Sequence, residues 1–250
     1  MNRPSPPGAG RLRPVCLAFI VWLGAAGPAD AQPSYEFWPE IDTWLRLSPA
    51  WRLSLFVPIS KNLETHYREG NFIPQADYAF GKRRFERRLM DEDGARNTNL
   101  LLLRGGYLGG KSLNDQGEAY TEYTGFGELH VRLPLKGGFL LSHRLRTELR
   151  WLGKDNHELS NRWRYRLMLE KELAAGRASI VPYASVEPYY DSRYDTVNRV
   201  RLIAGSSVAW WRRTALEVNG TYQYDSHSST KELLALNVIL HLFFDVSRHQ

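Results

Sequence analysis

The stretch GFLLSHRLRTELRWL, residues 138–152, decides the fold that this sequence predicts. Alternate residues from Phe139 to Trp151 are mostly apolar, and the residues between them include a serine, three arginines and a glutamate. Successive side chains of a strand point to opposite faces, whereas a helix would spread these charges around its whole circumference. The stretch is therefore predicted to be a β-strand with one apolar face and one charged face.

The same period of two recurs along most of the chain and predicts an all-β protein. It returns from Arg162 to Glu172 and again from Thr214 to Asp225. The eleven strands that we expect lie at about 41–48, 51–61, 72–81, 97–109, 119–133, 138–152, 161–173, 178–190, 197–210, 214–225 and 232–244. The charged stretch 81–96 is predicted to extend a strand and turn on the periplasmic side.

The connections between these strands fall into two classes that alternate from the middle of the chain onward. Short ones lie at 48–50, 134–137, 174–177 and 211–212, and longer polar ones at 110–117, 153–160, 191–196 and 226–231. Short turns on one side and longer loops on the other are typical of an antiparallel transmembrane β-barrel. Because bacterial single-chain barrels have an even number of strands, we expect twelve, with a further short strand around 35–38. Ten is the alternative, if 41–48 does not span.

The first thirty-one residues are predicted to be a signal peptide cleaved after Ala31, and residues 32–250 to be the barrel. Arg11 and Arg13 precede an apolar run that is too short to span a bilayer, and Ala29-Asp30-Ala31 fits a signal-peptidase site. The single cysteine, Cys16, lies at the start of that run, so the mature protein is expected to have neither disulfide nor lipid anchor. We therefore expect export to the outer membrane of a Gram-negative bacterium.

The charge of the chain argues against nucleic acid as a partner. The net charge of the whole chain is +6, and it falls to +4 when the predicted signal peptide is removed with its three arginines and one aspartate. An excess this small and dispersed is not the footprint of a nucleic-acid-binding protein. No later stretch holds eighteen consecutive apolar residues, so no transmembrane helix is expected.

Aromatic residues gather near the predicted strand ends, where a girdle at the membrane interface would lie. They are Trp44, Trp51, Trp151, Trp163, Tyr189, Tyr190, Trp210, Trp211, Phe243 and Phe244. The aromatic end of the last strand resembles the signal read by the barrel-assembly machinery. The expected partners are therefore outer-membrane lipid and, during biogenesis, that machinery, and the barrel is expected to be a monomer.

The charged face of the strands is predicted to line the lumen. The inward bases are Arg132, Arg144, Arg146, Arg150, Arg162, Arg164, Arg166, Arg199 and Arg201, and the inward acids are Glu122, Glu128, Glu148, Glu170, Glu172, Glu187, Glu217 and Asp225. If 134–137 closes a hairpin, Glu128 faces Arg144, and Arg164 lies between Glu148 and Glu187. Two interpretations stay open: opposite charges pair and fill a narrow lumen, or unpaired arginines line a water-filled path that favours anions.

An enzyme is the alternative class. Ser142, His130 and Glu128 would share the lumen and make a serine–histidine–carboxylate set, although a lipid hydrolase needs its serine at the lipid face. His227-Ser228-Ser229, in a predicted external loop, is similar to the His-x-Ser pattern of lipid A deacylases. The seven histidines are dispersed, so neither a metal site nor a cofactor is expected.

Four segments follow in an order that resembles a bacterial family catalogued as domain of unknown function 2490. They are the residues 143–150 (HRLRTELR), 162–167 (RWRYRL), 182–187 (PYASVE) and 198–201 (NRVR). The likeness is best from about 118 to 244. The resemblance implies an outer-membrane barrel and supplies no catalytic residues. The leading function is thus a structural role or a narrow passive channel, a lipid-modifying hydrolase or acyltransferase is the runner-up, and a periplasmic β-sandwich is third.

Overall fold

The computed structural model describes residues 33–84, 97–114, 121–152, 158–175, 178–211 and 213–246. The predicted signal peptide and most of the charged stretch 81–96 lie outside these residues, so both remain predictions. Within the described ranges, no helix is long and apolar enough to cross a membrane.

The described chain is built almost entirely from β-strands. They are β1 (Ser34–Arg46), β2 (Trp51–Asn62), β3 (Arg68–Arg84), β4 (Asn97–Ser112), β5 (Thr121–Pro134), β6 (Phe139–Leu152), β7 (Glu158–Lys171), β8 (Leu173–Ala175), β9 (Ala178–Asp191), β10 (Thr196–Trp211), β11 (Thr214–Asp225) and β12 (Glu232–Asp245). Each of the eleven longer strands overlaps one of the eleven segments predicted from the period of two, although the bounds differ, most of all for β1, which begins at Ser34 rather than at about 41. The all-β fold class is thereby confirmed.

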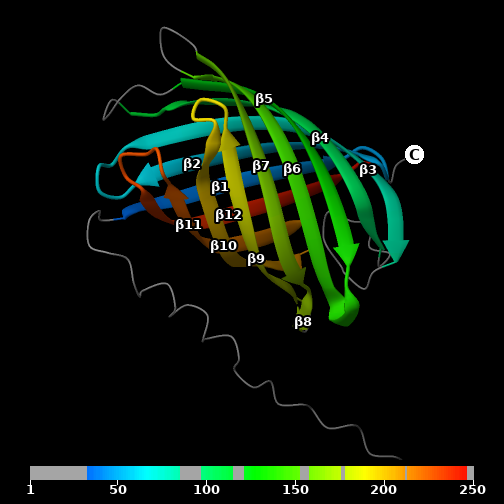
Figure 1. Ribbon diagram of the computed structural model, residues 1–250. Coiled ribbons are helices and arrows are strands. Elements are labelled where there is room, and N and C mark those ends of the chain that lie inside the picture. Colours follow the sequence, from blue (N-terminus) through cyan, green and yellow to red (C-terminus); the bar gives the residue numbers. More distant parts are fainter. Residues whose placement is uncertain are drawn as a thin grey trace, which may run out of the picture. The chain divides into compact units, whose positions relative to one another are not determined.

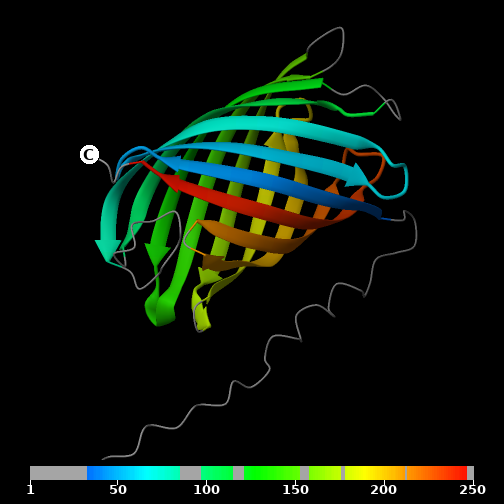
Figure 2. The same cartoon turned by 180° about the vertical axis from the view of Figure 1, so that it is seen from behind.

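The strands close into a barrel (Figure 1). Sequential strands pair antiparallel from β1 to β7, then β9 pairs with β7 and β10, and β10, β11 and β12 follow in order. The ring closes where β12 pairs with β1 in parallel, from Ser34 opposite Leu233 to Arg46 opposite Asp245. Figure 2 shows this seam from behind, with β12 in red beside β1 in blue.

The total of twelve strands agrees with the prediction, but the twelfth is not where we expected it. Residues 35–38 belong to the continuous strand β1, and the additional strand is the short β8, which pairs only with β9. The ring itself therefore contains eleven strands. An odd number is compatible with closure only because the first and last strands run parallel.

The barrel is polar inside and apolar outside. Among the described residues, twenty-two polar or charged residues are buried and only seven apolar ones are. On β6, Glu148 is 1% exposed, whereas its neighbour Leu149 is 38% exposed. Large apolar side chains on every long strand point outward in the same way. A water-soluble protein has the opposite arrangement, with apolar side chains inside. Polar residues inside and apolar residues outside are typical of a transmembrane barrel, in which residues facing the lumen and the lipid alternate along each strand.

The β5–β6 hairpin has a register two residues away from the expected one. Glu128 lies opposite Arg146 rather than Arg144, because the connection is longer than a tight turn. It contains a short 3-10 segment, η2 (Lys136–Gly138), in which Gly137 and Gly138 both have positive φ. Glycine adopts that conformation without steric cost. A shift of two keeps every side chain on its predicted face.

The aromatic girdle is only partly where the sequence suggested. Trp51, Trp163 and Phe244 are about half exposed on the outside of the barrel. Trp44 and Phe243 instead line the interior and stack with each other. Tyr189, also assigned to the girdle, is 1% exposed and lies beneath several arginines. Their position near strand ends did not reveal which face they occupy.

Candidate functional site: the charged interior

The barrel encloses an interior cavity of about 810 Å³. Thirteen of the seventeen residues predicted to face inward border it directly: Glu122, Glu128, Arg132, Arg144, Arg146, Arg150, Arg162, Arg164, Arg166, Glu170, Arg199, Arg201 and Glu217. Glu148 and Glu187 are instead buried beneath the arginines, at 1% and 0% exposure, and Asp225 is buried at 4%. Glu172, which does not border the cavity either, accepts a hydrogen bond from the hydroxyl of Ser179. The interior wall thus carries a dense array of ionic groups.

Glu187, on β9, is the shared partner of three arginines from two strands. It accepts hydrogen bonds from Arg144 Nη2 at 2.6 Å, from Arg164 Nε at 2.9 Å and from Arg166 Nη2 at 2.7 Å. A carboxylate without exposure is stable in its ionised form only when cations and donors surround it. Glu187 therefore links β6, β7 and β9 through its three arginine partners.

Glu148, on β6, holds a second set of three arginines. Arg146 Nε donates to its Oε1 at 2.5 Å, Arg164 Nη1 donates to the same oxygen at 3.1 Å, and Arg162 Nε donates to Oε2. Arg164 consequently bridges Glu148 and Glu187, which confirms the pairing predicted for it. The two glutamates and their arginines form one connected ionic network on β6, β7 and β9.

Glu128, on β5, extends this network to β4. It accepts from Arg146 Nη1 at 2.9 Å and is bonded to His130 Nε2 at 2.7 Å, while Arg104 Nη1 lies 3.4 Å away. Arg104 also pairs with Asp77 on β3, at 2.6 Å. Arg104 and Asp77 were not among the residues proposed from the sequence.

Further ion pairs lie at the strand ends next to the connections 153–157, 192–195 and 226–231. Arg150 Nε donates to Glu122 Oε1 at 2.9 Å, and Arg199 pairs with Asp225 at 2.7 Å. Arg193, in the loop between β9 and β10, donates two hydrogen bonds to Asp191, and these bonds raise the pKa of its guanidinium. The turn 192–195 is thus held to β9 through the ion pair between Arg193 and Asp191.

Arg201, on β10, differs from its neighbours. Its Nε donates to Gln223 Oε1 at 2.6 Å, and its guanidinium lies 5.2 Å from the ring centre of Trp38 and 5.4 Å from that of Tyr189. Across the described ranges, no carboxylate forms an ion pair with it. Arg201 lines the cavity, and within the described residues neither Nη1 nor Nη2 makes a hydrogen bond or an ion pair.

The opposite wall is acidic, and the sequence analysis missed most of it. Glu36, Glu40 and Asp42 of β1 line the cavity together with Glu69 of β3 and Glu217 of β11. The alternation from 36 to 44 contains the signal that would have found the first three, because residues two apart share a face. These early strands were left without assigned faces.

His241, on β12, links two of these acids. Its Nδ1 lies 3.2 Å from Asp42 Oδ2 and its Nε2 lies 3.2 Å from Glu217 Oε2. Tyr183 and Asn219 also donate to Glu217 Oε1. This chain of contacts joins β9, β11, β12 and β1 across the inside of the barrel.

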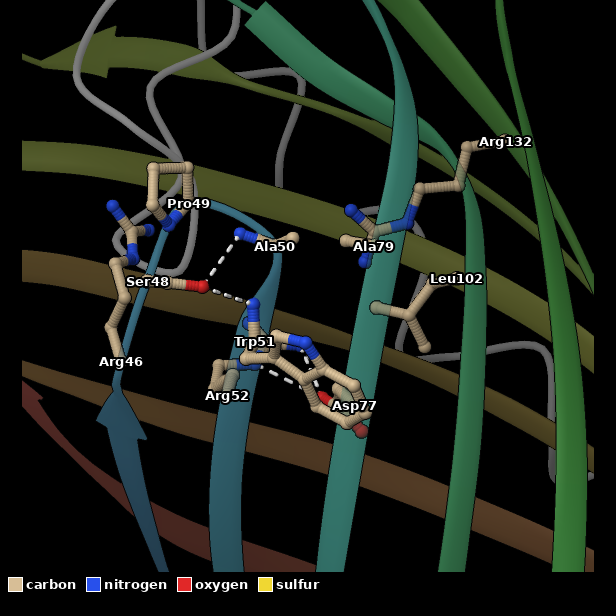
Figure 3. A pocket seen from close by; sticks show the side chains of 10 residues that line it. All are labelled: Arg46, Ser48, Pro49, Ala50, Trp51, Arg52, Asp77, Ala79, Leu102 and Arg132. Carbon is tan, nitrogen blue, oxygen red and sulfur yellow. Dashed lines mark hydrogen bonds and ion pairs between the residues drawn. The ribbon is translucent and has the colours of Figure 1, made fainter.

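A second, much smaller pocket of about 20 Å³ lies beside the turn between β1 and β2 (Figure 3). Ser48 Oγ accepts hydrogen bonds from the amides of Ala50 and Trp51 there, and Arg52 pairs with Asp77 at 2.6 Å. A volume of this size holds about one water molecule. The turn is held by its own hydrogen bonds, and the pocket is too small for a solute.

The residues considered for hydrolysis do not form a relay. His130 is bonded to Glu128, but Ser142 Oγ makes no hydrogen bond within the described part of the chain. In the loop after β11, His227 contacts Ser226 and stacks on Tyr194 with 4.1 Å between ring centres. The described residues also contain no cluster of histidine and carboxylate side chains suited to a metal ion.

Comparisons with known proteins give one match. A family model described as "Protein of unknown function (DUF2490)" matches residues 35–233, which includes the early strands and most, but not all, of the region from about 118 to 244 where the resemblance was expected to be best. No curated protein and no solved structure matches the chain.

Proposed function

This chain belongs to the DUF2490 family, and from that premise we propose that it is an outer-membrane barrel that serves as a narrow passive channel. The ionic network forms the rigid wall of the passage. The proposal combines the two interpretations that the sequence left open, because most arginines are paired and a cavity nevertheless remains.

The outer surface supports the membrane assignment. Leu145 and Trp163, on adjacent strands, are 46% and 55% exposed. Exposed apolar side chains on every long strand would be a liability in water and are the expected surface in lipid. The connections 63–67 and 226–231, of five and six residues, lie at one end of the barrel, and the turns 47–50 and 135–138, of four residues each, lie at the other. The end with the shorter turns would be periplasmic.

The cavity of about 810 Å³ is the observation that carries the channel. Side chains just fill a barrel of about eight strands, whereas about sixteen leave an aqueous channel. A ring of eleven strands lies between these limits. Pairing draws the arginines against the wall, since Glu148 and Glu187 lie beneath them, and this leaves room along the axis.

Planar-bilayer recording of the refolded protein tests the proposal. We expect a small, steady potassium chloride conductance above that of the bare bilayer, from protein that migrates differently on a gel before and after boiling. A barrel with the gel shift but without conductance would refute the channel and leave a structural role. Protein recovered in the periplasmic fraction without detergent would refute the membrane assignment.

A further inference from the structure

We propose that the interior cavity binds small zwitterionic solutes, with the solute's carboxylate at Arg201 and its ammonium group at Glu36 and Glu69. The inference rests on the proposed function for its physiological meaning, since a bound solute must enter from one side. The binding itself is a property of the cavity and is tested separately.

The cavity has two walls of opposite charge. Among the described residues that border it, ten arginines and three glutamates lie on β4 to β10, whereas five carboxylates and one arginine lie on β1, β2, β3, β11 and β12. The near balance of charge counted from the sequence therefore hides a separation in space. A dipolar solute gains energy at both of its ends in such a field, and an ion of either sign gains at one wall only.

Arg201 supplies the position for the carboxylate. Gln223 occupies its Nε, and the rings of Trp38 and Tyr189 flank the guanidinium, so Nη1 and Nη2 remain for a ligand. A guanidinium edge with two donors matches the two oxygens of a carboxylate. The arginines that pair with Glu128, Glu148 and Glu187 already have such partners and do not compete for the solute.

Glu36 and Glu69 supply the position for the ammonium group. Both line the cavity, and their strands bring them near each other, since Glu36 lies opposite Asn62 of β2 and Glu69 lies opposite Ser60, two residues earlier on the same strand. Glu36 accepts the indole N–H of Trp38 through Oε2 at 2.5 Å, which places that carboxylate beside the ring on which Arg201 lies. An ammonium group donates in three directions and can be shared between two carboxylates.

Four solutes of nearly equal size separate the charge requirements: alanine, lactate, alaninamide and lactamide. Their binding to the detergent-solubilised barrel is measured by saturation-transfer NMR titration. We expect alanine to bind best and neutral lactamide worst. Equal binding of all four, or a preference for lactate over alanine, would overturn the proposal, the latter in favour of a simple anion site.

Two variants test the two halves of the site. Arg201→Gln should weaken alanine binding about fivefold, the size of one partly solvated ion pair, and leave alaninamide unchanged. The double variant Glu36→Gln with Glu69→Gln should weaken alanine and alaninamide and leave lactate unchanged, and it tests the proposal even if Arg201→Gln does not fold. The control is Arg213→Gln, at an exposed arginine in the turn before β11.

Failure of the two proposals can be told apart by the bilayer recording. A barrel that conducts potassium chloride but binds the four solutes alike refutes the zwitterion site and leaves the channel. A barrel that binds alanine selectively but does not conduct supports the site and refutes the passage. Selectivity for alanine that survives both Arg201→Gln and the double glutamate variant would contradict the assigned positions.

Discussion

Replacing Glu187 by glutamine should destabilise the barrel more than any single arginine removal from the same network. Glu187 has no exposed surface and accepts from Arg144, Arg164 and Arg166. The glutamine keeps the shape of the side chain but removes its charge. Three arginines whose side chains are 14%, 12% and 25% exposed would then share one anion fewer.

The loss of unfolding free energy expected for each substitution depends on how many charged residues lose an ion-pair partner. Removing one partner of a buried ion pair costs about 3–5 kcal/mol, against about 0–1 kcal/mol at an exposed surface. Glu187→Gln should lie in the first range because it affects three cations together. Arg164→Ala should lie between these two ranges, at about 1–3 kcal/mol, because Glu148 keeps Arg146 and Arg162 and Glu187 keeps its two other arginines.

Urea unfolding of the barrel in lipid vesicles, followed by tryptophan fluorescence and by the gel shift, measures both free energies. Glu64→Gln is the matched control, since that glutamate is exposed in the loop after β2 and should change stability by less than about 0.5 kcal/mol. A Glu187→Gln barrel as stable as the control would refute the network as a structural element. A larger cost for Arg164→Ala than for Glu187→Gln would refute the ranking.

Further predictions concern packing, topology and location. Gly205→Ala should cost about 1–3 kcal/mol in the same assay, because the added Cβ would overlap Asn219 on β11, whereas Gly220→Ala meets no atom within 4 Å and should be neutral. Ile41→Cys with Leu240→Cys, in a chain without Cys16, should form an intramolecular disulfide on oxidation, since these residues are paired across the seam; a folded barrel that does not cross-link would contradict the parallel closure. In cells, the protein should sediment with the outer membrane, and its recovery in a soluble fraction would be the opposite result.

The strands were predictable because alternation is a local signal. Residues 138–152 carry it so strongly that strand, face and charge follow without knowledge of the partners. Connections were less predictable: the register of the β5–β6 hairpin depended on the two left-handed glycines, Gly137 and Gly138, and the sequence suggested a tighter turn. Because the register differs from the expected one by two residues, every side chain of this hairpin still lies on its predicted face.

What the sequence did not reveal is the arrangement of the charges across the barrel. Counting the inward acids and bases along the sequence gives their numbers but not their positions around the barrel. The count therefore does not show that Glu40 and Arg164 lie on different walls. Interior aromatic residues were misplaced for a related reason. Trp44 and Tyr189 occupy strand ends, as girdle residues do, but they carry arginines over their rings, Arg52 at 4.3 Å and Arg164 at 4.5 Å, and such contacts depend on neighbouring strands.

The parallel seam between β1 and β12 has a consequence for the speed of folding. Ser34 pairs with Leu233, about two hundred residues away in the chain, whereas β5 and β6 meet across a short turn. The entropy of closing a flexible loop grows with the logarithm of its length, so pairing these two strands before the intervening strands form would cost about 3 kcal/mol more than forming such a hairpin. Pairings between sequential strands can form early and independently, and the ring can close only after they are in place. Substitutions at the seam should therefore slow folding more than equal destabilisation elsewhere in the barrel.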